Sequence, residues 1–122
     1  MGLHDKIKVA AIDCDGILRG KVMHKSKFLT SLHSRFRMSS VMLGWDMHDV
    51  LFTEEPKMVA EGTSYKDLTA SINLDSFRRL PFEDNIAFFL LQFAIGSKLV
   101  AMDGRSLTQS LIRTMASQGF KV

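Results

Sequence analysis

The sequence predicts an α+β fold in which a mixed sheet packs against one helix and a second helix follows at the C-terminal end. Three observations favour this class. Alternating apolar residues flank the turn Asp15-Gly16, which indicates a β-hairpin. The run from Asn85 to Phe93 is apolar on both faces, which is typical of a central strand. Apolar residues at helical spacing follow the capping residues Ser26 and Ser106.

The N-terminal third predicts a hairpin followed by a short helix. Lys6 to Asp13 alternates as a strand does, and Ile17 to Met23 is the expected return strand. Gly16 supplies the positive φ angle that a tight turn requires. Ser26 is the expected N-cap of the helix. The apolar face of this helix would consist of Phe28, Leu29 and Leu32.

The middle of the chain is predicted to alternate between irregular and extended segments. Arg35 to Gly44 is expected to form a loop, because serine and glycine interrupt its pattern. Trp45 to Phe52 is expected to form a strand that stops near Pro56. Leu68 to Asn73 alternates cleanly and predicts a further strand, and Phe77 to Phe82 is expected to be extended.

The last element is predicted to be a helix. Ser106 with Gln109 matches a capping box, and Gly119 is the expected C-terminal stop. Apolar residues at helical spacing follow one side, namely Leu107, Leu111, Ile112 and Met115.

Length and charge limit the class of protein. A chain of 122 residues suits one domain, and 46% apolar residues are ordinary for a globular core. Sixteen Lys and Arg against thirteen Asp and Glu give a net charge of only +3. These charges are spread along the chain rather than clustered, so we expect no nucleic-acid partner.

The cysteine content and the length of the apolar runs indicate the cellular compartment of the protein. Cys14 is the only cysteine, which excludes an internal disulfide framework and a Cys-based zinc site and fits a reducing compartment. The N-terminus lacks a secretory hydrophobic core, and the longest apolar stretch, Ile86 to Leu91, is too short to span a bilayer. The prediction is a cytoplasmic protein with no membrane partner.

No motif predicts catalysis by this chain alone. The sequence contains no phosphate-binding glycine loop and no histidine pair at metal-ligand spacing. Its four histidines are scattered and are interpreted as surface residues. Asp13 and Asp15 flank a turn and are interpreted as turn residues rather than metal ligands. We therefore expect no catalytic residue and no metal site.

Two features keep alternative interpretations open. Arg19 and Lys21 lie two residues apart on one strand, so their side chains share a face. That face is either solvated or an interface that binds a phosphate or the carboxylates of a partner. Trp45, the only tryptophan, is either an anchor in the core or a residue at a subunit boundary, where aromatic residues are enriched.

Four short motifs occur in a fixed order: IDCDGILRGK at 12–21, GWD at 44–46, DLTA at 67–70 and FRRLPFED at 77–84. Together they resemble the amino-terminal β-grasp domain of the glutamine synthetase family, especially glutamate–amine ligases with a DGxLRGK hairpin and a GWDxxD segment. The resemblance implies a β-grasp-like mixed sheet packed on one helix over residues 1–100. Residues 101–122 would be a linker helix that leads toward a catalytic domain absent from this chain.

The resemblance also implies an activity and partners. In that family, ATP phosphorylates the side chain of glutamate, and an amine then displaces the phosphate. The β-grasp domain of one subunit packs against the catalytic barrel of its neighbour in an oligomer. The barrel holds the metal ligands and most of the nucleotide site, so ATP and Mg²⁺ or Mn²⁺ are implied for the full-length protein and no cofactor for this chain. The implied partner is such a barrel or a neighbouring subunit.

Few site residues follow from the resemblance. Trp45 matches the family tryptophan that lines the site, and Ser40 lies near the position of the aspartate that binds ammonium. No Asp or Glu occurs from Arg35 to Gly44, which disfavours ammonium and suits a bulkier amine or a member without activity. We therefore expect Trp45 and Ser40 to form a wall of the substrate site, and Arg19 and Lys21 to face an interface.

The motifs and the resemblance favour two functions. The first is the N-terminal domain of a glutamate–ammonia or glutamate–amine ligase of nitrogen metabolism and glutamine biosynthesis. The chain alone would be inactive, because it ends at Val122 before any Glu-x-Glu metal motif. The alternative is a non-enzymatic β-grasp module for interaction or regulation. A plain α+β domain with coincidental motifs is the third interpretation, since a fold class implies no function.

Overall fold

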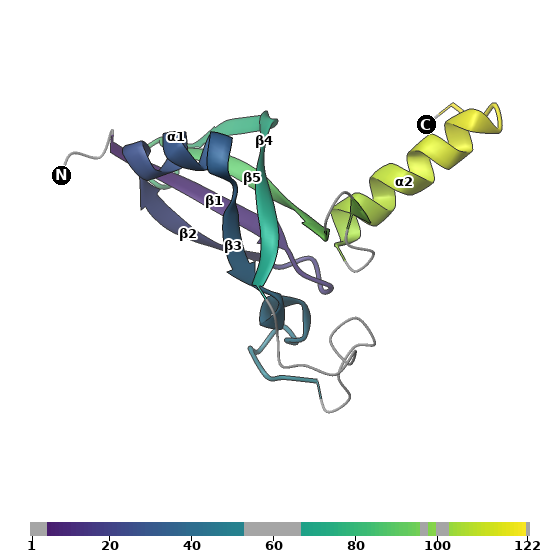
Figure 1. Cartoon of the computed structure of the whole chain (residues 1–122), viewed down its shortest axis with the longest axis horizontal. Helices are drawn as coiled ribbons and strands as arrows, with labels where there is room; N and C mark the ends of the chain where they lie inside the picture. Colours follow the sequence, from purple (N-terminus) through teal and green to yellow (C-terminus); the bar gives the residue numbers. More distant parts are fainter. Residues whose placement is uncertain (1–4, 53–66, 96–97, 100–102, 122) are drawn as a thin grey trace.

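A computed structural model describes residues 5–52, 67–95, 98–99 and 103–121 as a curled mixed sheet with one helix against it and a second helix beyond it (Figure 1). This confirms the predicted α+β class with a β-grasp-like sheet. In chain order the elements are β1 (Lys6–Ile12), β2 (Leu18–His24), α1 (Lys25–Ser34), β3 (Phe36–Ser39), the 3₁₀ helix η2 (Ser40–Leu43), β4 (Asp67–Leu80), β5 (Ile86–Ile95), β6 (Lys98–Leu99) and α2 (Gly104–Ser117).

The sheet is mixed because β1 runs parallel to its neighbour β5, the middle strand of the sheet. The strand order is β2-β1-β5-β4-β3, and β6 pairs with β5 outside this path. β1 and β5 are parallel, with Ile7 opposite Ala87, whereas the other described pairs are antiparallel. β5 lies between β1 and β4, which confirms its prediction as a central strand. A strand with two apolar faces is stable there because both faces are covered by other side chains.

One face of the sheet packs against α1 and contains the main core. Phe28 of α1 contacts Phe89 of β5, with their ring centroids 4.8 Å apart. Val9 of β1 and Phe93 of β5 are completely buried on the same face. Trp45 packs against the edge of this cluster. The interleaved side chains of β1, β5 and α1 therefore hold the hairpin against the central strand.

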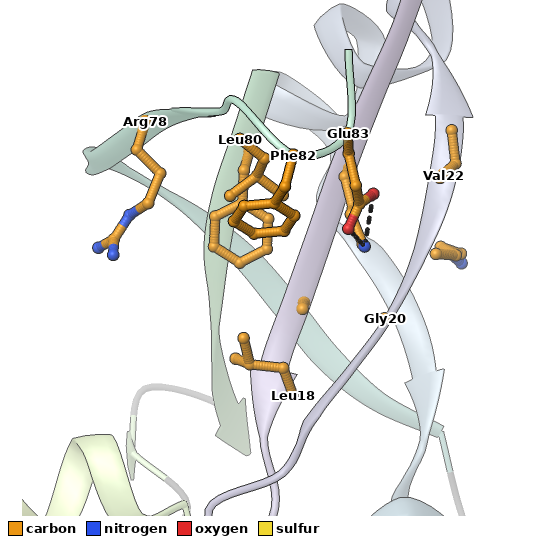
Figure 2. A pocket seen from close by; sticks show the side chains of 11 residues that line it. Leu18, Gly20, Val22, Arg78, Leu80, Phe82 and Glu83 are labelled. Atoms are coloured by element: carbon orange, nitrogen blue, oxygen red, sulfur yellow. Dashed lines mark hydrogen bonds and ion pairs between the residues drawn. The ribbon is translucent and has the colours of Figure 1, made fainter. Parts of the chain in front are cut away.

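The opposite face of the sheet has a smaller cluster and an open groove. Ala10, Phe88 and Leu90 form the buried part of this cluster. The groove has a volume of about 510 Å³ and lies between β2 and the turn after β4 (Figure 2). Phe82 lies on that turn with 79% of its surface exposed. Beside it, Glu83 pairs with Lys8 Nζ at 2.5 Å. α1 thus covers one face of the sheet and leaves this one accessible.

The strand β4 contains a bulge, which lies between the two segments that were predicted separately. Leu68 to Asn73 and Phe77 to Phe82 were expected as distinct pieces, but the structure joins most of both in one 14-residue strand. The register against β5 shifts between Asn73 and Arg78. Ser76 lies in this bulge, where its Oγ donates to Asn73 O at 2.5 Å and accepts from Leu90 N at 2.7 Å. These bonds satisfy backbone groups that the bulge would otherwise leave unpaired.

Both predicted N-caps are wrong by a few residues. The N-cap of α1 is His24, whose Nδ1 accepts from the amide of Ser26 at 3.2 Å. The N-cap of α2 is Asp103, which accepts from the amide of Arg105 at 3.3 Å and from the hydroxyl of Ser106 at 2.5 Å. In each case an acceptor that lies two or three residues before the predicted serine bonds an amide of the first turn, so the helix starts earlier.

The predicted end of α2 is confirmed. Gly119 has a φ of 87° and its amide donates to Ala116 O at 3.0 Å. The amide of Phe120 donates to Met115 O at 3.0 Å, which completes a Schellman motif. α2 extends away from the sheet (Figure 1), and Gln92 of β5 donates to its Gln109 at 3.1 Å. Within the described ranges, neither helix is long and apolar enough to cross a membrane.

The predictions for residues 35–52 are wrong in two places. The expected loop at Arg35–Gly44 contains β3, which pairs with β4, followed by η2. The expected strand at Trp45–Phe52 is instead a turn, in which one isolated bridge joins Trp45 and Leu51. Pro56, the expected end of that strand, lies outside the described residues.

Gly20 provides a test of the hairpin packing, because β1 and β2 approach closely there. A Cβ at this position would lie only 2.7 Å from the Cα of Ala10. We expect Gly20→Ala to lower the free energy of unfolding by about 1–3 kcal/mol, as overpacked sites do. Urea denaturation, followed by tryptophan fluorescence, measures this loss.

Gly104→Ala is the matched control, since no atom lies within 4 Å of a Cβ there. Its effect should stay within about 0.5 kcal/mol. Equal stability of the Gly20→Ala variant and the unchanged chain would contradict the close approach of the two strands.

Candidate functional site

The candidate site begins at a buried carboxylate in the turn between β1 and β2. Asp13 is only 1% exposed. Its Oδ1 accepts from the amides of Asp15 and Ile17 at 2.9 and 2.8 Å, and its own amide donates to Ile17 O at 3.0 Å. These bonds give the turn its shape, as an aspartate does when it caps its own backbone. The interpretation of Asp13 as a turn residue is confirmed.

A buried carboxylate requires a cationic partner, and Arg19 supplies it. Arg19 lies on β2 opposite Ala11 and donates from Nε to Asp13 Oδ2 at 2.5 Å. The side chain of Arg19 is 12% exposed and that of Asp13 is fully buried. Both oxygens of Asp13 therefore have donors, which offsets the cost of removing the charge from water.

The outer nitrogens of Arg19 reach a second segment of the chain, residues 44–52, which we name the tryptophan loop. Nη2 donates to Asp46 O at 2.8 Å, and Nη1 pairs with the carboxylate of Asp49. The guanidinium also lies over the ring of Trp45, 5.2 Å from its centroid. Hydrogen bonds to Asp49 and Asp13 raise the pKa of Arg19 further above its ordinary value. Arg19 thus joins the hairpin to the tryptophan loop through charge, hydrogen bonds and a cation–π contact.

The tryptophan loop has its own internal scaffold. Asp46 Oδ1 accepts from the amides of His48 and Val50 at 2.8 and 3.0 Å. The amide of Asp46 donates to Val50 O, and that of Phe52 donates to Gly44 O, both at 2.9 Å. The two amide donors hold the pKa of Asp46 below its ordinary value. The loop is therefore closed by backbone bonds that need no ligand.

The outer surface of this loop is mostly apolar, although His48 and Asp49 are exposed as well. Its exposed residues include four large hydrophobic side chains, namely Met47, Val50, Leu51 and Phe52. Such a group beside a fixed tryptophan is typical of a surface that contacts another molecule. The loop presents hydrophobic contact area, whereas the carboxylates near it are occupied by the chain itself.

The structure separates the residues that were predicted to act together. Arg19 contacts the tryptophan loop, whereas Lys21, two residues further along β2 and opposite Val9, is exposed and is among the residues that line the groove. Ser40 begins η2 and is 6% exposed, and Trp45 follows two residues after that helix ends. The proposed roles of Trp45 and Ser40 in a wall, and of Arg19 and Lys21 at an interface, remain predictions.

Three further residues of the site were not predicted from the sequence. Asp46 and Asp49 shape the loop and bind Arg19, and their spacing within GWDxxD was the available signal. Cys14 has its Sγ 3.8 Å from Trp45 O, which is a weak thiol hydrogen bond. Partial burial, followed by the charges of Asp15 and Asp13, raises the pKa of this thiol. Its contact with the loop could not be inferred from spacing.

The described residues do not fit a catalytic metal. They contain no group of three or more His, Cys, Asp or Glu side chains that could hold an ion. Asp13 and Asp49 pair with Arg19, and Asp46 Oδ1 accepts from backbone amides. This arrangement of carboxylates is that of a structural ion-pair network rather than the octahedral oxygen site that Mg²⁺ requires.

Comparisons with known proteins identify relatives. No family model matches the chain. Over 87 residues, or 71% of its length, it is 39% identical to type-1 glutamine synthetase 2 of Dictyostelium discoideum, 16% of which is covered. Over 119 residues, or 96% of its length, it is 24% identical to a glutamate–isopropylamine ligase of Pseudomonas sp, 26% of which is covered. The chain therefore spans only about a sixth to a quarter of these relatives.

Solved structures show the same fold. A structure described as a novel glutamine synthase homolog superposes with a TM-score of 0.75 at 14% identity, over 97% of this chain and 28% of that one. A complex of GmaS with ADP superposes with a TM-score of 0.69 at 12% identity, over 93% of this chain and 23% of that one. At these identities the similarity demonstrates the fold alone.

The thiol of Cys14 allows a test of the site's electrostatics. Because its pKa is raised, a smaller fraction is thiolate at a given pH, so we expect alkylation by iodoacetamide to reach half its maximal rate at a higher pH than in an unstructured peptide. Mass spectrometry follows the reaction directly, since this is the only cysteine. Asp15→Asn removes one negative neighbour and should move the profile to lower pH. A profile that matches the peptide would contradict the described surroundings of the thiol.

Proposed function

Because the chain belongs to the glutamine synthetase family, as a counterpart of its amino-terminal domain, we propose that it provides one wall of the active site of an ATP-dependent glutamate–amine ligase. The wall would face the catalytic domain of a neighbouring subunit. The observation that supports this proposal is the tryptophan loop, in which Trp45 is fixed by Arg19 at the edge of the sheet and is flanked by exposed apolar side chains.

The division of chemistry follows from the residues present. The parts of such a ligase outside this segment would bind ATP, glutamate and the divalent cations that offset the charge of a γ-glutamyl phosphate. The described part of this chain contributes no metal ligands. Its contribution would be to bind and orient the amine and to exclude water. The segment alone would not catalyse the ligation.

The character of the tryptophan loop favours an apolar amine over ammonium. Ammonium requires a free carboxylate, but Asp49 pairs with Arg19 and Asp46 is bonded to backbone amides. Arg35 and Arg37, on the segment that precedes the loop, are exposed cations that would repel ammonium. An alkylamine would instead bury its carbon atoms against the apolar loop. One of the relatives bears the name of such an enzyme, a glutamate–isopropylamine ligase.

Residues 101–122 would form the link toward the catalytic domain. Within this range α2 extends away from the sheet, and its exposed residues include Leu107, Leu111 and Ile112 (Figure 1). A group of exposed apolar side chains on one helix commonly marks a surface that another element contacts.

The alternative function is a non-enzymatic interaction module. The open groove of Figure 2 favours this possibility, because exposed Phe82, Leu18 and Val22 surround it. β2 is also an edge strand of the sheet. A partner could add to such an edge or cover such a face without any chemistry.

An activity test uses a chimera in which this chain replaces the matching segment of the Pseudomonas glutamate–isopropylamine ligase. We expect the chimera to release ADP in the presence of glutamate, isopropylamine and Mg²⁺, and the 122-residue chain alone to release none. In the chimera, Trp45→Ala should lower kcat/KM for the amine about tenfold to a hundredfold, because a misplaced substrate reacts slowly. A coupled ADP assay measures both.

Phe82→Ala is the control, since Phe82 is an exposed aromatic residue on the opposite face. Its kcat/KM should remain within about twofold of the parent. ADP release by the isolated chain, or equal activity of the Trp45→Ala and parent chimeras, would refute the proposed wall. A folded but inactive chimera, with a partner that binds the isolated chain through Phe82, would favour the interaction module.

A further inference from the structure

The proposed function leaves the first motif of the chain without a role. The motif at 12–21 forms the hairpin turn and the start of β2, whereas the tryptophan loop follows α1, β3 and η2. The structure nevertheless brings the two together through Arg19, whose contacts bridge 27 and 30 positions of sequence to Asp46 and Asp49. Because Arg19 contacts both the hairpin and the tryptophan loop, it can determine how the loop is positioned relative to the hairpin.

We propose that Arg19 is a positioning residue, which sets the orientation of Trp45 and holds the tryptophan loop against the hairpin. In this assignment Arg19 neither touches the substrate nor binds a phosphate or a partner. It acts through the indole of Trp45. The consequence for catalysis rests on the proposed function, whereas the consequence for the position of Trp45 does not.

The orientation of Arg19 is set from inside the protein. Asp13 is held by two backbone amides and cannot rotate without losing them. Its second oxygen receives Nε of Arg19 at 2.5 Å, which directs the plane of the guanidinium. Each remaining nitrogen then has a different acceptor, Nη2 the carbonyl of Asp46 and Nη1 the carboxylate of Asp49. Only a planar fork with several fixed donors makes these contacts at once, so a lysine would not replace it.

The two ion pairs of Arg19 differ in burial. The side chain of Asp13 is fully buried, whereas that of Asp49 is 69% exposed. An exposed pair contributes little because water competes for it, and a buried pair contributes much more to orientation. Asp13 therefore sets the guanidinium, and Asp49 is an outer contact whose loss should loosen the loop only in part.

The tryptophan loop does not need Arg19 for its internal shape. The bonds from Asp46 Oδ1 to the amides of His48 and Val50 lie within the loop itself. Loss of Arg19 should leave these bonds in place but remove the cation over the ring of Trp45 and the bond to Asp46 O. The expected result is a closed loop that is no longer fixed to the hairpin.

Trp45 is the only tryptophan, so its fluorescence reports its own position. In the 122-residue chain, Arg19→Lys and Arg19→Met should both move the emission maximum to longer wavelength. The quenching constant for acrylamide should rise about twofold or more, as expected for a ring that loses its cation–π partner. Far-UV circular dichroism verifies that the sheet and helices are retained.

Arg79→Met is the matched control. Arg79 also lies near an aromatic ring, 6.0 Å from the centroid of Phe77, and donates to Asn85 O at 2.9 Å. It has no described contact with the tryptophan loop, so its loss should leave the emission and quenching of Trp45 unchanged. Wild-type quenching in the Arg19→Lys variant, or the same rise in Arg79→Met, would overturn the proposal.

Asp49→Asn decides the question if the Arg19 variants fail to fold. This residue is exposed, and the buried pair between Asp13 and Arg19 remains intact. The variant should fold. Its acrylamide quenching constant should lie between that of Trp45 in the unchanged chain and that of a fully solvated tryptophan. No rise in quenching would overturn the part of the proposal in which Arg19 holds the loop through this outer contact.

The ligase chimera tests whether the position of Trp45 matters for catalysis. We expect Arg19→Lys to lower kcat/KM for the amine about tenfold, mainly through KM, because the wall that orients the amine is displaced. In the Trp45→Ala background the same change should have almost no further effect, since both act through one ring. Additive losses would overturn action through Trp45. An inactive parent chimera would refute the proposed function and leave the fluorescence result to decide the role of Arg19.

Discussion

The ion pair between Asp13 and Arg19 connects the parts of this domain that carry its distinctive motifs. A carboxylate with a fully buried side chain is stable only when each oxygen has a donor, and here two amides and a guanidinium provide them. Removal of one member of such a pair leaves an uncompensated charge, at a cost of about 3–5 kcal/mol. The shape of the hairpin turn and the attachment of the tryptophan loop both depend on this pair.

The sheet positions this ion pair relative to the core. The parallel pairing of β1 with β5 places the hairpin beside the most apolar strand, and α1 covers the face where Val9 and Phe93 are buried. The end of β1 is thereby fixed, and Asp13 directly follows it. The other face remains accessible around Phe82, and α2 extends beyond the sheet.

The chemistry near Trp45 is that of a surface for contact and orientation. Asp13 and Asp49 pair with Arg19, and Asp46 accepts from backbone amides. Each of these three carboxylates already accepts a hydrogen bond from the chain itself. The exposed part of the loop is mostly apolar, with Met47, Val50, Leu51 and Phe52 beside His48 and Asp49. In the proposed ligase, the charged steps would therefore belong to the catalytic domain, and this segment would determine which amine fits and how it is oriented.

Elements whose signal is local were predicted well. The turn at Asp15-Gly16 requires one glycine with positive φ, the helix stop at Gly119 requires another, and the two apolar faces of β5 are visible in nine consecutive residues. The family resemblance rests on motifs of the same short range. Each of these signals depends only on residues within a few positions of one another, so it can be recognised from the sequence without knowledge of the fold.

The predictions were wrong where the same local pattern of residues is compatible with two different backbone conformations. Trp45 to Phe52 has the apolar content of a strand, but the side chain of Asp46 bonds two amides and turns the chain back on itself. Ser26 and Ser106 resemble N-caps, yet His24 and Asp103 are acceptors that lie earlier and start the helices first.

The sequence alone thus determined the fold class, the hairpin, the central strand and the family. It also placed Arg19 and Lys21 on one face of a strand, because side chains alternate with period two. Only the tertiary structure decided what lies opposite Arg19, since its partners Asp46 and Asp49 follow an intervening helix and strand. Periodicity specifies the face of an element but not the element that packs against it. The same long-range packing decided that Trp45, which is half-buried against the edge of the main core, also lies beneath the guanidinium of Arg19.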